Sequence, residues 1–495
     1  MGIDLILDMA AGAHGDRVAL GRRAGGLSFA DLDRAAAGGA GVLRASGAGS
    51  IAYIGLNGPV LPALMFAATR AGIPLTPLNY RLSAGQLRAL LAELDRPYVV
   101  ADPAFMPAVA AAAPSEEWLD LALASEPVAP AQVDDSAPAV VLFTSGTTSK
   151  PKAVVLRHSH LLSYVLETVE FGSADAEDAV LVSVPPYHIA GVGSVLSNLY
   201  AGRRMTYLPD FHPGEWLQLV QHDRVTHAMV VPTMLARIVG ELDGATADAP
   251  ALRSIAYGGA RMPSTVLRAA LNAFPGSDFV NAYGLTETSS TIAVLGPEDH
   301  RAALAGDAVA ITRLGSVGRM VPGVQCQIRG EHGEPLAPGE TGEIWVRGAQ
   351  VSGEYQGIGS VLDEFGWFPT RDRGRLDADG YLFVDGRSDD TIIRGGENIA
   401  PAEIEDVLIE HPAVDQVVVL GAPDEEWGER IVAVIVPAAG ADPDPHDLRA
   451  CVKARLRSSR TPDEVVFRSE LPYTATGKVL RRELLADAGE RKPLP

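Results

Sequence analysis

The sequence predicts an α/β protein in which a large N-terminal region of doubly wound layers is followed by a small α+β unit. Up to about Pro138, alanine-rich helical patterns alternate with short apolar runs, which is typical of a parallel, doubly wound sheet. Residues 316–385 then change to short strands with regular glycine and proline punctuation, which predicts a small β-barrel or β-layer. Helical and strand patterns return in the last part of the chain and predict the compact α+β unit.

The first elements can be placed from local signals. Ser28 stands in the N-cap position before an amphipathic run and predicts a helix start, and Ser159 predicts a second one. Residues 51–55 are apolar, end on a glycine and predict a buried strand. Residues 180–184 predict another strand. These alternating elements support the doubly wound arrangement.

Composition narrows the class of protein. The chain has 495 residues, 47% of them apolar and 21% charged, which suits an ordinary globular protein of two or more domains. Its formal net charge of −21 argues against a general nucleic-acid or anionic-membrane surface. Two cysteines and an N-terminus without a basic signal region predict a cytoplasmic protein, and no apolar run is long enough to span a membrane.

Residues 144–152, Thr-Ser-Gly-Thr-Thr-Ser-Lys-Pro-Lys, join two β-branched apolar runs and form the most informative loop. Hydroxyls, backbone N–H groups and two lysines in one tight connection are suited to polyphosphate binding. An ordinary polar hairpin turn is the alternative. The spacing of a Walker P-loop is absent.

Three further stretches carry chemistry-bearing residues. Residues 254–260 are a predicted strand that ends in a glycine pair, which permits close approach of a flat ligand. Residues 280–287 end in Tyr-Gly-Leu-Thr-Glu. Residues 381–390 are acidic around a glycine and a serine and are suited to a domain linker.

These motifs together resemble the adenylate-forming superfamily of acyl-CoA synthetases, peptide-synthetase adenylation domains and firefly-type luciferases. The loop at 144–152 resembles the family's phosphate-binding loop, residues 283–287 its Tyr-Gly-x-Thr-Glu signature, and residues 472–478 its catalytic-lysine loop Pro-x-Thr-x-x-Gly-Lys. The resemblance extends from the first residues to about Leu484. Ser149, Ala153 and Arg371 depart from it, because the family has glycine at all three positions.

The resemblance implies roles for individual residues. The implied catalytic residues are Lys478, Thr286, Glu287 and His188, with Glu287 also the Mg²⁺ ligand. The implied ATP- and AMP-binding residues are Thr144, Ser145, Gly146, Thr147, Thr148, Lys152, Gly258, Gly259, Ala260, Ala282, Tyr283, Gly284, Asp372 and Arg387. The candidate acyl pocket consists of His188, Val192, Gly193, Met229, Pro232, Tyr257, Gly258 and Ala282. A core-edge histidine that only bonds a carbonyl is the alternative for His188.

The resemblance also implies an N-terminal adenylate-forming domain over residues 1–388 and a mobile C-terminal domain over residues 389–495. Asp389 falls at the family's hinge residue. Gly395, Gly396 and Glu397 fall in the loop that approaches the site when the thiol attacks.

The implied activity is that of a carboxylate–CoA ligase that uses ATP, Mg²⁺ and coenzyme A and passes through an acyl-adenylate. Four alternatives stay open: transfer to the phosphopantetheine of a carrier protein, thiolation of a preformed acyl-adenylate, a nucleotide-binding module without chemistry, and a luciferase-like oxygenase. The oligomeric state also stays open, with a homodimer as one alternative.

The substrate is predicted only as a class. The candidate acyl pocket is mostly apolar and contains no acid to hold an amino group, which disfavours amino acids. Gly193 and Gly258 leave room for a bulky, chain-like or ring-bearing acid. Arg261 could instead pair with a second carboxylate.

Overall fold

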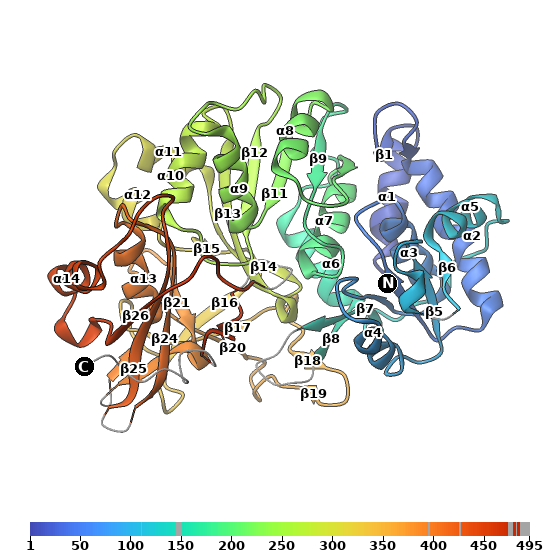
Figure 1. Ribbon diagram of the computed structural model, residues 1–495. Helices are drawn as coiled ribbons and strands as arrows, with labels where there is room; N and C mark the ends of the chain where they lie inside the picture. Colours follow the sequence, from blue (N-terminus) through green and yellow to red (C-terminus); the bar gives the residue numbers. More distant parts are fainter. Residues whose placement is uncertain are drawn as a thin grey trace.

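A computed structural model describes residues 1–109, 111–144, 151–394, 397–424, 427–473, 479–481 and 483–485, which form four β-sheets (Figure 1). The largest sheet is mostly parallel, with antiparallel strands at both edges. In spatial order its nine strands are β15 (Arg319–Met320), β14 (Ser290–Leu295), β13 (Asp278–Leu285), β12 (Ser254–Gly258), β11 (His227–Val230), β9 (Ala179–Val182), β10 (Arg204–Tyr207), β1 (Val18–Leu20) and β2 (Leu27–Ser28).

The second large sheet has a parallel half and an antiparallel half. Its eight strands are, in spatial order, β19 (Gly359–Ser360), β18 (Glu354–Tyr355), β8 (Lys152–Arg157), β7 (Pro138–Thr144), β4 (Leu75–Pro77), β3 (Ser50–Ile54), β5 (Pro97–Ala101) and β6 (Ala113–Pro114). The short strands β18 and β19 follow their neighbour β8 by about 200 residues in the sequence, and β18 pairs with β8.

Helices cover both large sheets and also fill the space between them. The main core joins side chains of both sheets with helices α1 (Asp4–His14), α2 (Phe29–Ser46), α3 (Val60–Ala71), α5 (Ser115–Ala124), α6 (His158–Thr168) and α7 (Ile189–Tyr200). A second core covers the other face of the nine-stranded sheet with α8 (Pro213–His222), α9 (Pro232–Leu242) and α10 (Ser264–Ala273). The outer face of the eight-stranded sheet carries α4 (Ala84–Leu91). This layering confirms the predicted doubly wound α/β fold.

The remaining sheets lie in the last third of the chain. The predicted β-rich segment forms an antiparallel sheet of β16 (Gln325–Arg329), β17 (Gly342–Arg347), β20 (Phe368–Leu376) and β21 (Leu382–Arg387). Its end strands β16 and β21 are not paired with each other, so among the described residues it is a β-layer and not a closed barrel. Helices α11 (Pro297–Leu304) and α12 (Ala308–Arg313) precede it.

The C-terminal part is the predicted α+β unit. Its sheet consists of β22 (Ile392–Arg394), β23 (Glu397–Ile399), β24 (Val414–Asp424), β25 (Gly428–Pro437) and β26 (Glu464–Phe467), and its helices are α13 (Pro401–Ile409) and α14 (Pro445–Arg455). Figure 1 shows these elements grouped at one end of the molecule, in orange and red. None of the helices in the described ranges is long and apolar enough to cross a membrane.

The predicted helix starts differ in outcome. Ser28 caps α2 as expected, because its hydroxyl accepts a hydrogen bond from the Asp31 backbone N–H at 3.0 Å and the Asp31 carboxylate accepts one from the Ser28 N–H. The prediction for Ser159 is wrong. Helix α6 begins one residue earlier, at His158, with Arg157 in the N-cap position.

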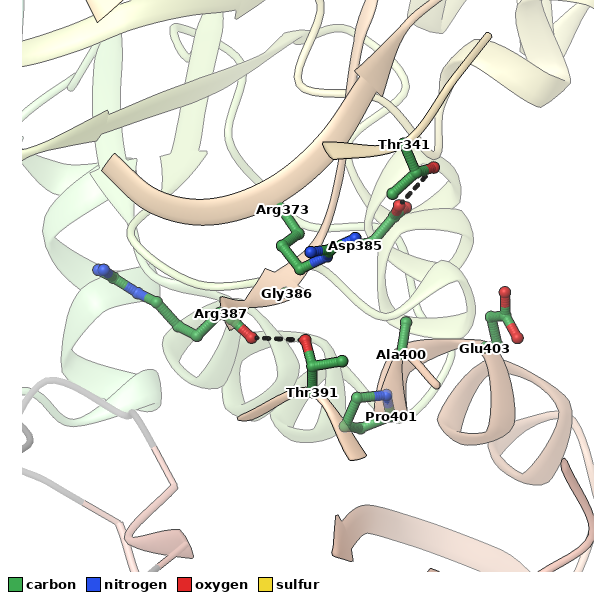
Figure 2. Close-up of a pocket in the computed structure, with 9 residues that line it drawn as sticks. All are labelled: Thr341, Arg373, Asp385, Gly386, Arg387, Thr391, Ala400, Pro401 and Glu403. Atoms are coloured by element: carbon green, nitrogen blue, oxygen red, sulfur yellow. Dashed lines mark hydrogen bonds between the residues drawn. The ribbon is translucent and has the colours of Figure 1, made fainter. Parts of the chain in front are cut away.

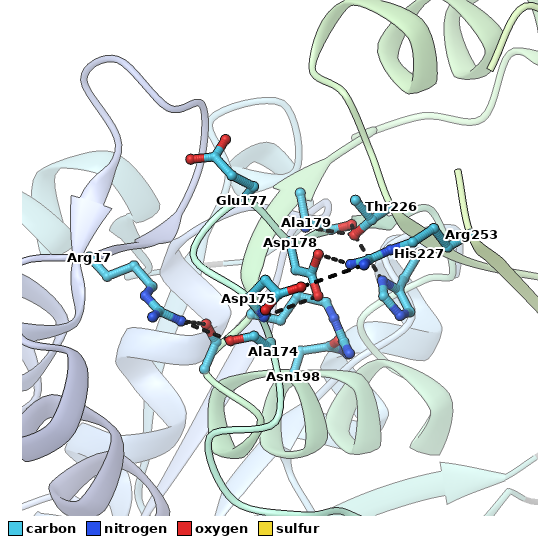
Figure 3. Close-up of polar contacts among 12 residues, drawn as sticks. Arg17, Ala174, Asp175, Glu177, Asp178, Ala179, Asn198, Thr226, His227 and Arg253 are labelled. Carbon is cyan, nitrogen blue, oxygen red and sulfur yellow. Dashed lines mark hydrogen bonds and ion pairs between the residues drawn. The ribbon is translucent and has the colours of Figure 1, made fainter. Parts of the chain in front are cut away.

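A polar cluster holds the amino-terminal edge of the nine-stranded sheet (Figure 3). Asp178 is 6% exposed, forms an ion pair with Arg253 and accepts a hydrogen bond from the Asp175 N–H at 3.2 Å. Thr226 exchanges hydrogen bonds with both backbone groups of Ala179 at 3.0 Å. The amino ends of these strands are therefore held together by contacts within the protein. The residues predicted to be functional lie at the opposite, carboxyl ends of the strands.

His227 belongs to this cluster and makes stability depend on pH. Its Nδ1 lies 2.8 Å from the Thr226 hydroxyl, and burial, assisted by Arg203, lowers the pKa of His227 to about 4. The pKa of a histidine in the unfolded chain is near 6.5, so the unfolded state binds the extra proton first. The stabilisation is complete above about pH 6.5 and is lost as the pH falls towards 4.

We expect the His227→Gln variant to lose less free energy of unfolding than the parent protein between pH 7 and pH 5. The difference should be at most about 2 kcal/mol, because one proton linked over one and a half pH units corresponds to that amount. Urea unfolding at both pH values measures it. Replacing the exposed His222 by Gln serves as the control and should reproduce the parent protein. A His227→Gln variant with the parent's pH dependence would contradict the assignment.

Candidate active site

Three neighbouring parallel strands, β11, β12 and β13, end at the same edge of the nine-stranded sheet. At this edge Gly258 lies opposite Ala282, and a Cβ atom on Gly258 would be 2.1 Å from the Ala282 carbonyl oxygen. Gly259 follows with a φ of +82°, a conformation that glycine adopts without steric cost, and Ala260 comes next. The backbone here is too close-packed for a side chain at Gly258, and the exposed Gly259 and Ala260 form the surface at the end of β12.

Tyr283, Asp372 and Arg387 come together beside this surface from strands β13, β20 and β21. The Tyr283 hydroxyl donates to Asp372 Oδ2 at 2.5 Å, and Arg387 Nε lies 2.9 Å from Asp372 Oδ1. The Asp372 side chain is only 8% exposed. Burial and the neighbouring Asp372 carboxylate raise the pKa of Tyr283, so the phenol stays protonated and donates. The structure thus brings together three residues that the sequence analysis singled out separately.

Arg371, next to Asp372, adopts a left-handed backbone conformation with φ of +64°. The pairing of β17 with β20 shifts here, because Glu343 pairs with Arg373 and Trp345 pairs with Pro369. Strand β20 therefore has two extra residues here, and the resulting bulge includes Arg371, where the family that the sequence resembles has glycine. A non-glycine residue in this region carries strain of about 1–2 kcal/mol.

Glu287 lies in a short 3₁₀ turn, Thr286–Thr288, directly after β13. Thr288 is completely buried, and its hydroxyl lies 3.0 Å from each of the Leu285 and Ser290 carbonyl oxygens. The neighbouring backbone is packed so closely that a Cβ on Gly284 would lie 1.7 Å from the Ser290 carbonyl oxygen. The Glu287 carboxylate is therefore carried by a turn with little freedom to move.

Thr144 and Lys152 flank the predicted phosphate loop at the ends of β7 and β8, where they pair with each other. Four loop residues of the predicted nucleotide site, Ser145, Gly146, Thr147 and Thr148, lie outside the described residues. The Thr144 hydroxyl donates to the Lys152 carbonyl oxygen at 3.3 Å, and both residues are exposed or partly exposed.

Tyr355 connects Lys152, at the start of β8, to the Glu287 turn. The sequence analysis did not predict this contact. The Tyr355 hydroxyl donates to Glu287 Oε1 at 2.9 Å, and Lys152 Nζ lies 5.3 Å from the centre of the Tyr355 ring. Both burial and Glu287 raise the pKa of Tyr355. The only sequence signal is an aromatic residue after Gly353-Glu354 in a region of short strands, which does not reveal a contact with either partner.

The candidate acyl pocket is brought together only in part. Met229 pairs in register with Val182 of β9 and with Ala256 of β12, so it shares their face towards the layer between the large sheets. Ala282 of β13 lies opposite Gly258, the last residue of β12, and a Cβ on Gly193 of α7 would be 3.2 Å from the Ser290 hydroxyl oxygen. This face carries small and apolar side chains.

The structure buries three side chains of the candidate acyl pocket, those of Tyr257, Val192 and Pro232. Tyr257 is 1% exposed, packs in the core beneath α8, α9 and α10, and its hydroxyl lies 2.8 Å from His300 Nε2. Strand alternation turns its side chain to the face opposite Met229. Val192 is completely buried in the core between the sheets. Pro232 is the first residue of α9 and is also buried.

His188 occupies the N-cap position of α7, and its ring centre lies 4.4 Å from that of Tyr187. Tyr187 in turn contacts Tyr80, which stacks on Phe105 at 5.0 Å. The predicted histidine therefore belongs to an aromatic group next to the start of α7, at the carboxyl end of β9.

The predicted hinge and thiolation residues are described only partly. Asp389 is exposed in a 3₁₀ turn, Ser388–Asp390, between β21 and β22. Glu397 forms an ion pair with Arg460. Gly395, Gly396 and Lys478 lie outside the described residues.

Residues on the two sides of the predicted hinge meet at a polar cavity of about 260 Å³ (Figure 2). Residues of both sides line it: Thr341, Arg373, Asp385, Gly386, Arg387, Thr391, Ala400, Pro401 and Glu403. Nearby, Arg261 forms an ion pair with Asp406 of α13. This contact gives Arg261 a partner within the protein and joins the edge of the nine-stranded sheet to the C-terminal part.

Comparisons with known proteins agree with this geometry. The profile of the AMP-binding enzyme family matches residues 7–356, and that of the AMP-binding enzyme C-terminal domain matches residues 403–478. The chain is 34% identical to an indoleacetate–CoA ligase of Aromatoleum aromaticum, with 97% of each chain covered. It is 36% identical to a feruloyl-CoA synthase of an Amycolatopsis species, covering 92% of this chain and 93% of that one.

Solved structures extend the comparison to the whole arrangement. ATP-bound MatB from Rhodopseudomonas palustris superimposes with a TM-score of 0.88 at 28% identity, and 99% of each chain is covered. The apo form of MatB, with the same identity and coverage, gives a TM-score of 0.78. The described arrangement is therefore more similar to the ATP-bound form.

The fold and the site define an ATP-binding, adenylate-forming ligase. The chain belongs to the AMP-binding enzyme family, in its acyl-CoA ligase branch. It is an acid–thiol ligase of the AMP-forming acyl-CoA synthetase type, which activates a carboxylic acid as an acyl-adenylate before thioester formation. The expectation of an enzyme is confirmed, and a nucleotide-binding module without chemistry is excluded.

The left-handed conformation of Arg371 predicts a difference between two variants. Arg371→Gly and Arg371→Ala both remove the guanidinium group, but only glycine relieves the strain at φ of +64°. We expect the glycine variant to be the more stable of the two by about 1 kcal/mol, measured by urea unfolding. Equal stability of the two variants, or a more stable alanine variant, would show that the position is unstrained.

Proposed function

We propose that the open surface at the ends of β12 and β13 binds the adenosine part of ATP, with Asp372 accepting the ribose hydroxyls and Arg387 assisting. One observation carries this proposal: the buried Asp372 carboxylate is held at both oxygens by Tyr283 and Arg387 beside the glycine surface. A carboxylate oxygen has lone pairs left after such contacts and can accept further hydrogen bonds. Gly258, Gly259 and Ala260 supply backbone contact with the flat base, and Tyr283 and Gly284 complete this wall.

The phosphates then extend towards Thr144, Lys152 and Glu287. Lys152 supplies a compact positive charge, and Thr286 supplies a hydroxyl beside the α-phosphate. The Glu287 carboxylate fits Mg²⁺, which prefers oxygen ligands and commonly takes one protein carboxylate together with substrate phosphates. When bound, Mg²⁺ would neutralise charge on the phosphate oxygens. Because the whole protein carries a net charge of −21, ATP binding depends on these local cations.

We propose that the acid is a ring-bearing monocarboxylic acid. The face formed by Gly193, Met229 and Ala282 is lined by small or apolar residues, and His188 stands with an aromatic group at its edge. The relatives named for indoleacetate and for feruloyl-CoA support a flat aromatic acid. Arg261, the candidate partner of a second carboxylate, is already paired with Asp406.

We propose coenzyme A as the acyl acceptor and a turn of residues 389–495 about Asp389 between the two half-reactions. The similarity to ATP-bound MatB supports the assignment of the described arrangement to the adenylation step. Thioester formation would then bring Gly395, Gly396 and Glu397 to the site and withdraw Lys478. Two reactions at one centre need different donors there, which gives the moving domain its purpose.

The substrate proposal is tested by measuring pyrophosphate release with a panel of carboxylic acids, followed by product analysis with coenzyme A. We expect arylacetic and cinnamic-type acids to give kcat/KM values at least tenfold higher than straight-chain fatty acids, dicarboxylic acids and amino acids. Higher values for fatty acids would overturn the ring-bearing substrate. Product formed only with a phosphopantetheinylated carrier protein would overturn the acceptor.

The proposed role of Lys478 predicts a split between the half-reactions. Lys478→Ala should lower adenylation of the acid by at least 100-fold, because a cation at the reacting phosphate and carboxylate is lost. Thioester formation from synthetic acyl-adenylate and coenzyme A should stay within about twofold of the parent protein. Equal loss in both assays would assign Lys478 another role. Lys453→Ala provides the control, because Lys453 is an exposed residue on helix α14.

A further inference from the structure

The segment 352–356 joins the phosphate-loop strand to the Glu287 turn by several independent contacts. The Ser352 and Gly353 N–H groups donate to the Glu287 carbonyl oxygen at 2.9 and 3.2 Å, and the Ser352 hydroxyl donates to the Val155 carbonyl oxygen of β8. The Gln356 N–H donates to the Ala153 carbonyl oxygen at 2.8 Å. The segment therefore bridges the two large sheets.

A bidentate ion pair secures the same segment. Arg157 at the end of β8 donates through Nε and Nη2 to the two oxygens of Glu354 at 2.8 and 2.7 Å. Both side chains are less than one third exposed. Fork-like pairs of this kind fix orientation as well as distance, so Tyr355, which follows Glu354, has a defined direction.

The turn that carries Glu287 needs such support. Ser289 and Ser290, just after the turn, have φ values of +56° and +101°, and both are buried. Non-glycine residues in these regions are strained and persist only where the surroundings hold them. The Gln350 amide, itself 1% exposed, donates to the Thr288 and Thr291 carbonyl oxygens at 2.9 Å each. Residues 350–356 thus hold the backbone of this turn.

Tyr355 extends that support to the side chains of the site. Its hydroxyl donates to Glu287 Oε1 at 2.9 Å, and its ring lies 5.3 Å from Lys152 Nζ, within cation–π range. One side chain therefore contacts both the proposed metal-binding carboxylate and the proposed phosphate-binding cation.

We propose that Tyr355 is a positioning residue that fixes the Glu287 carboxylate and the Lys152 ammonium group relative to each other for the adenylation half-reaction. The proposal rests on the proposed roles of those two residues. Tyr355 itself takes no proton and contacts no reacting atom. Its two contacts have different roles. The hydroxyl orients the Glu287 carboxylate, and the ring face orients the Lys152 ammonium group.

Two substitutions separate these contacts. Tyr355→Phe keeps the ring beneath Lys152 and removes the hydrogen bond to Glu287. We expect the Mg²⁺ concentration for half-maximal adenylation to rise about tenfold, with KM for ATP at saturating Mg²⁺ changed less than threefold. Tyr355→Leu removes both contacts and should raise KM for ATP about tenfold as well. Thioester formation from supplied acyl-adenylate should be unchanged in both variants, which a merely structural defect would not spare.

A double-mutant cycle with Glu287→Gln tests whether Tyr355 acts through Glu287. In the parent protein, the Tyr355→Phe change should raise the Mg²⁺ concentration for half-maximal adenylation about tenfold. In the Glu287→Gln background, the same change should raise this concentration less than twofold. Tyr98→Phe, on strand β5 away from the site, is the control and should reproduce the parent protein. Thermal unfolding of each variant establishes that it is folded.

The outcomes are distinct. A Tyr355→Phe protein with the parent's Mg²⁺ dependence overturns the positioning role. The role is also overturned if Tyr355→Phe raises the required Mg²⁺ concentration as much in the Glu287→Gln background as in the parent protein. An unchanged Mg²⁺ dependence in Glu287→Gln alone overturns the proposed metal role of Glu287 and with it the basis of the inference. If Tyr355→Leu lowers both half-reactions equally, the residue is structural.

Discussion

Close backbone approach at the ends of β12 and β13 is the constraint on which the rest of the site depends. At Gly258 and Gly284 the neighbouring carbonyl oxygens lie where a side chain would begin. The strands can therefore end without side chains projecting over their edge, and a flat ligand can reach the main chain. Tyr283, Asp372 and Arg387 lie beside this surface.

The charged residues of the site are organised as paired groups on rigid supports. Asp372 is held by Tyr283 and Arg387, and Glu287 is held by Tyr355. Both carboxylates accept a hydrogen bond from a tyrosine whose pKa is raised by burial. A neutral donor fixes the direction of a carboxylate without neutralising its charge, so each remains available for a ribose hydroxyl or a metal ion.

Backbone strain also occurs at this place. Arg371, Ser289 and Ser290 all have positive φ, and they flank Asp372 and Glu287. Such conformations cost free energy and are maintained by surrounding contacts, which for the two serines come from Thr288 and Gln350. The contacts that preserve the strain also keep the carboxylates where they are, which is consistent with a preorganised site.

The sequence by itself determined the fold class and the order of the main elements, and it predicted most residues of the proposed nucleotide site. These features depend on signals within a few residues of each other: alternation of helix and strand patterns, the Ser28 cap, the glycine pair after β12 and the Tyr-Gly-Leu-Thr-Glu run.

Only the tertiary structure decided which way a buried strand faces and which distant residues meet. Strand β12 is covered on both sides, so its sequence has no polar face to show that Tyr257 points towards the outer helices. The Tyr355 contact with Glu287 spans 68 residues, and the Arg261 contact with Asp406 spans 145. Such pairs are set by the packing of whole layers against each other, and no local pattern encodes them.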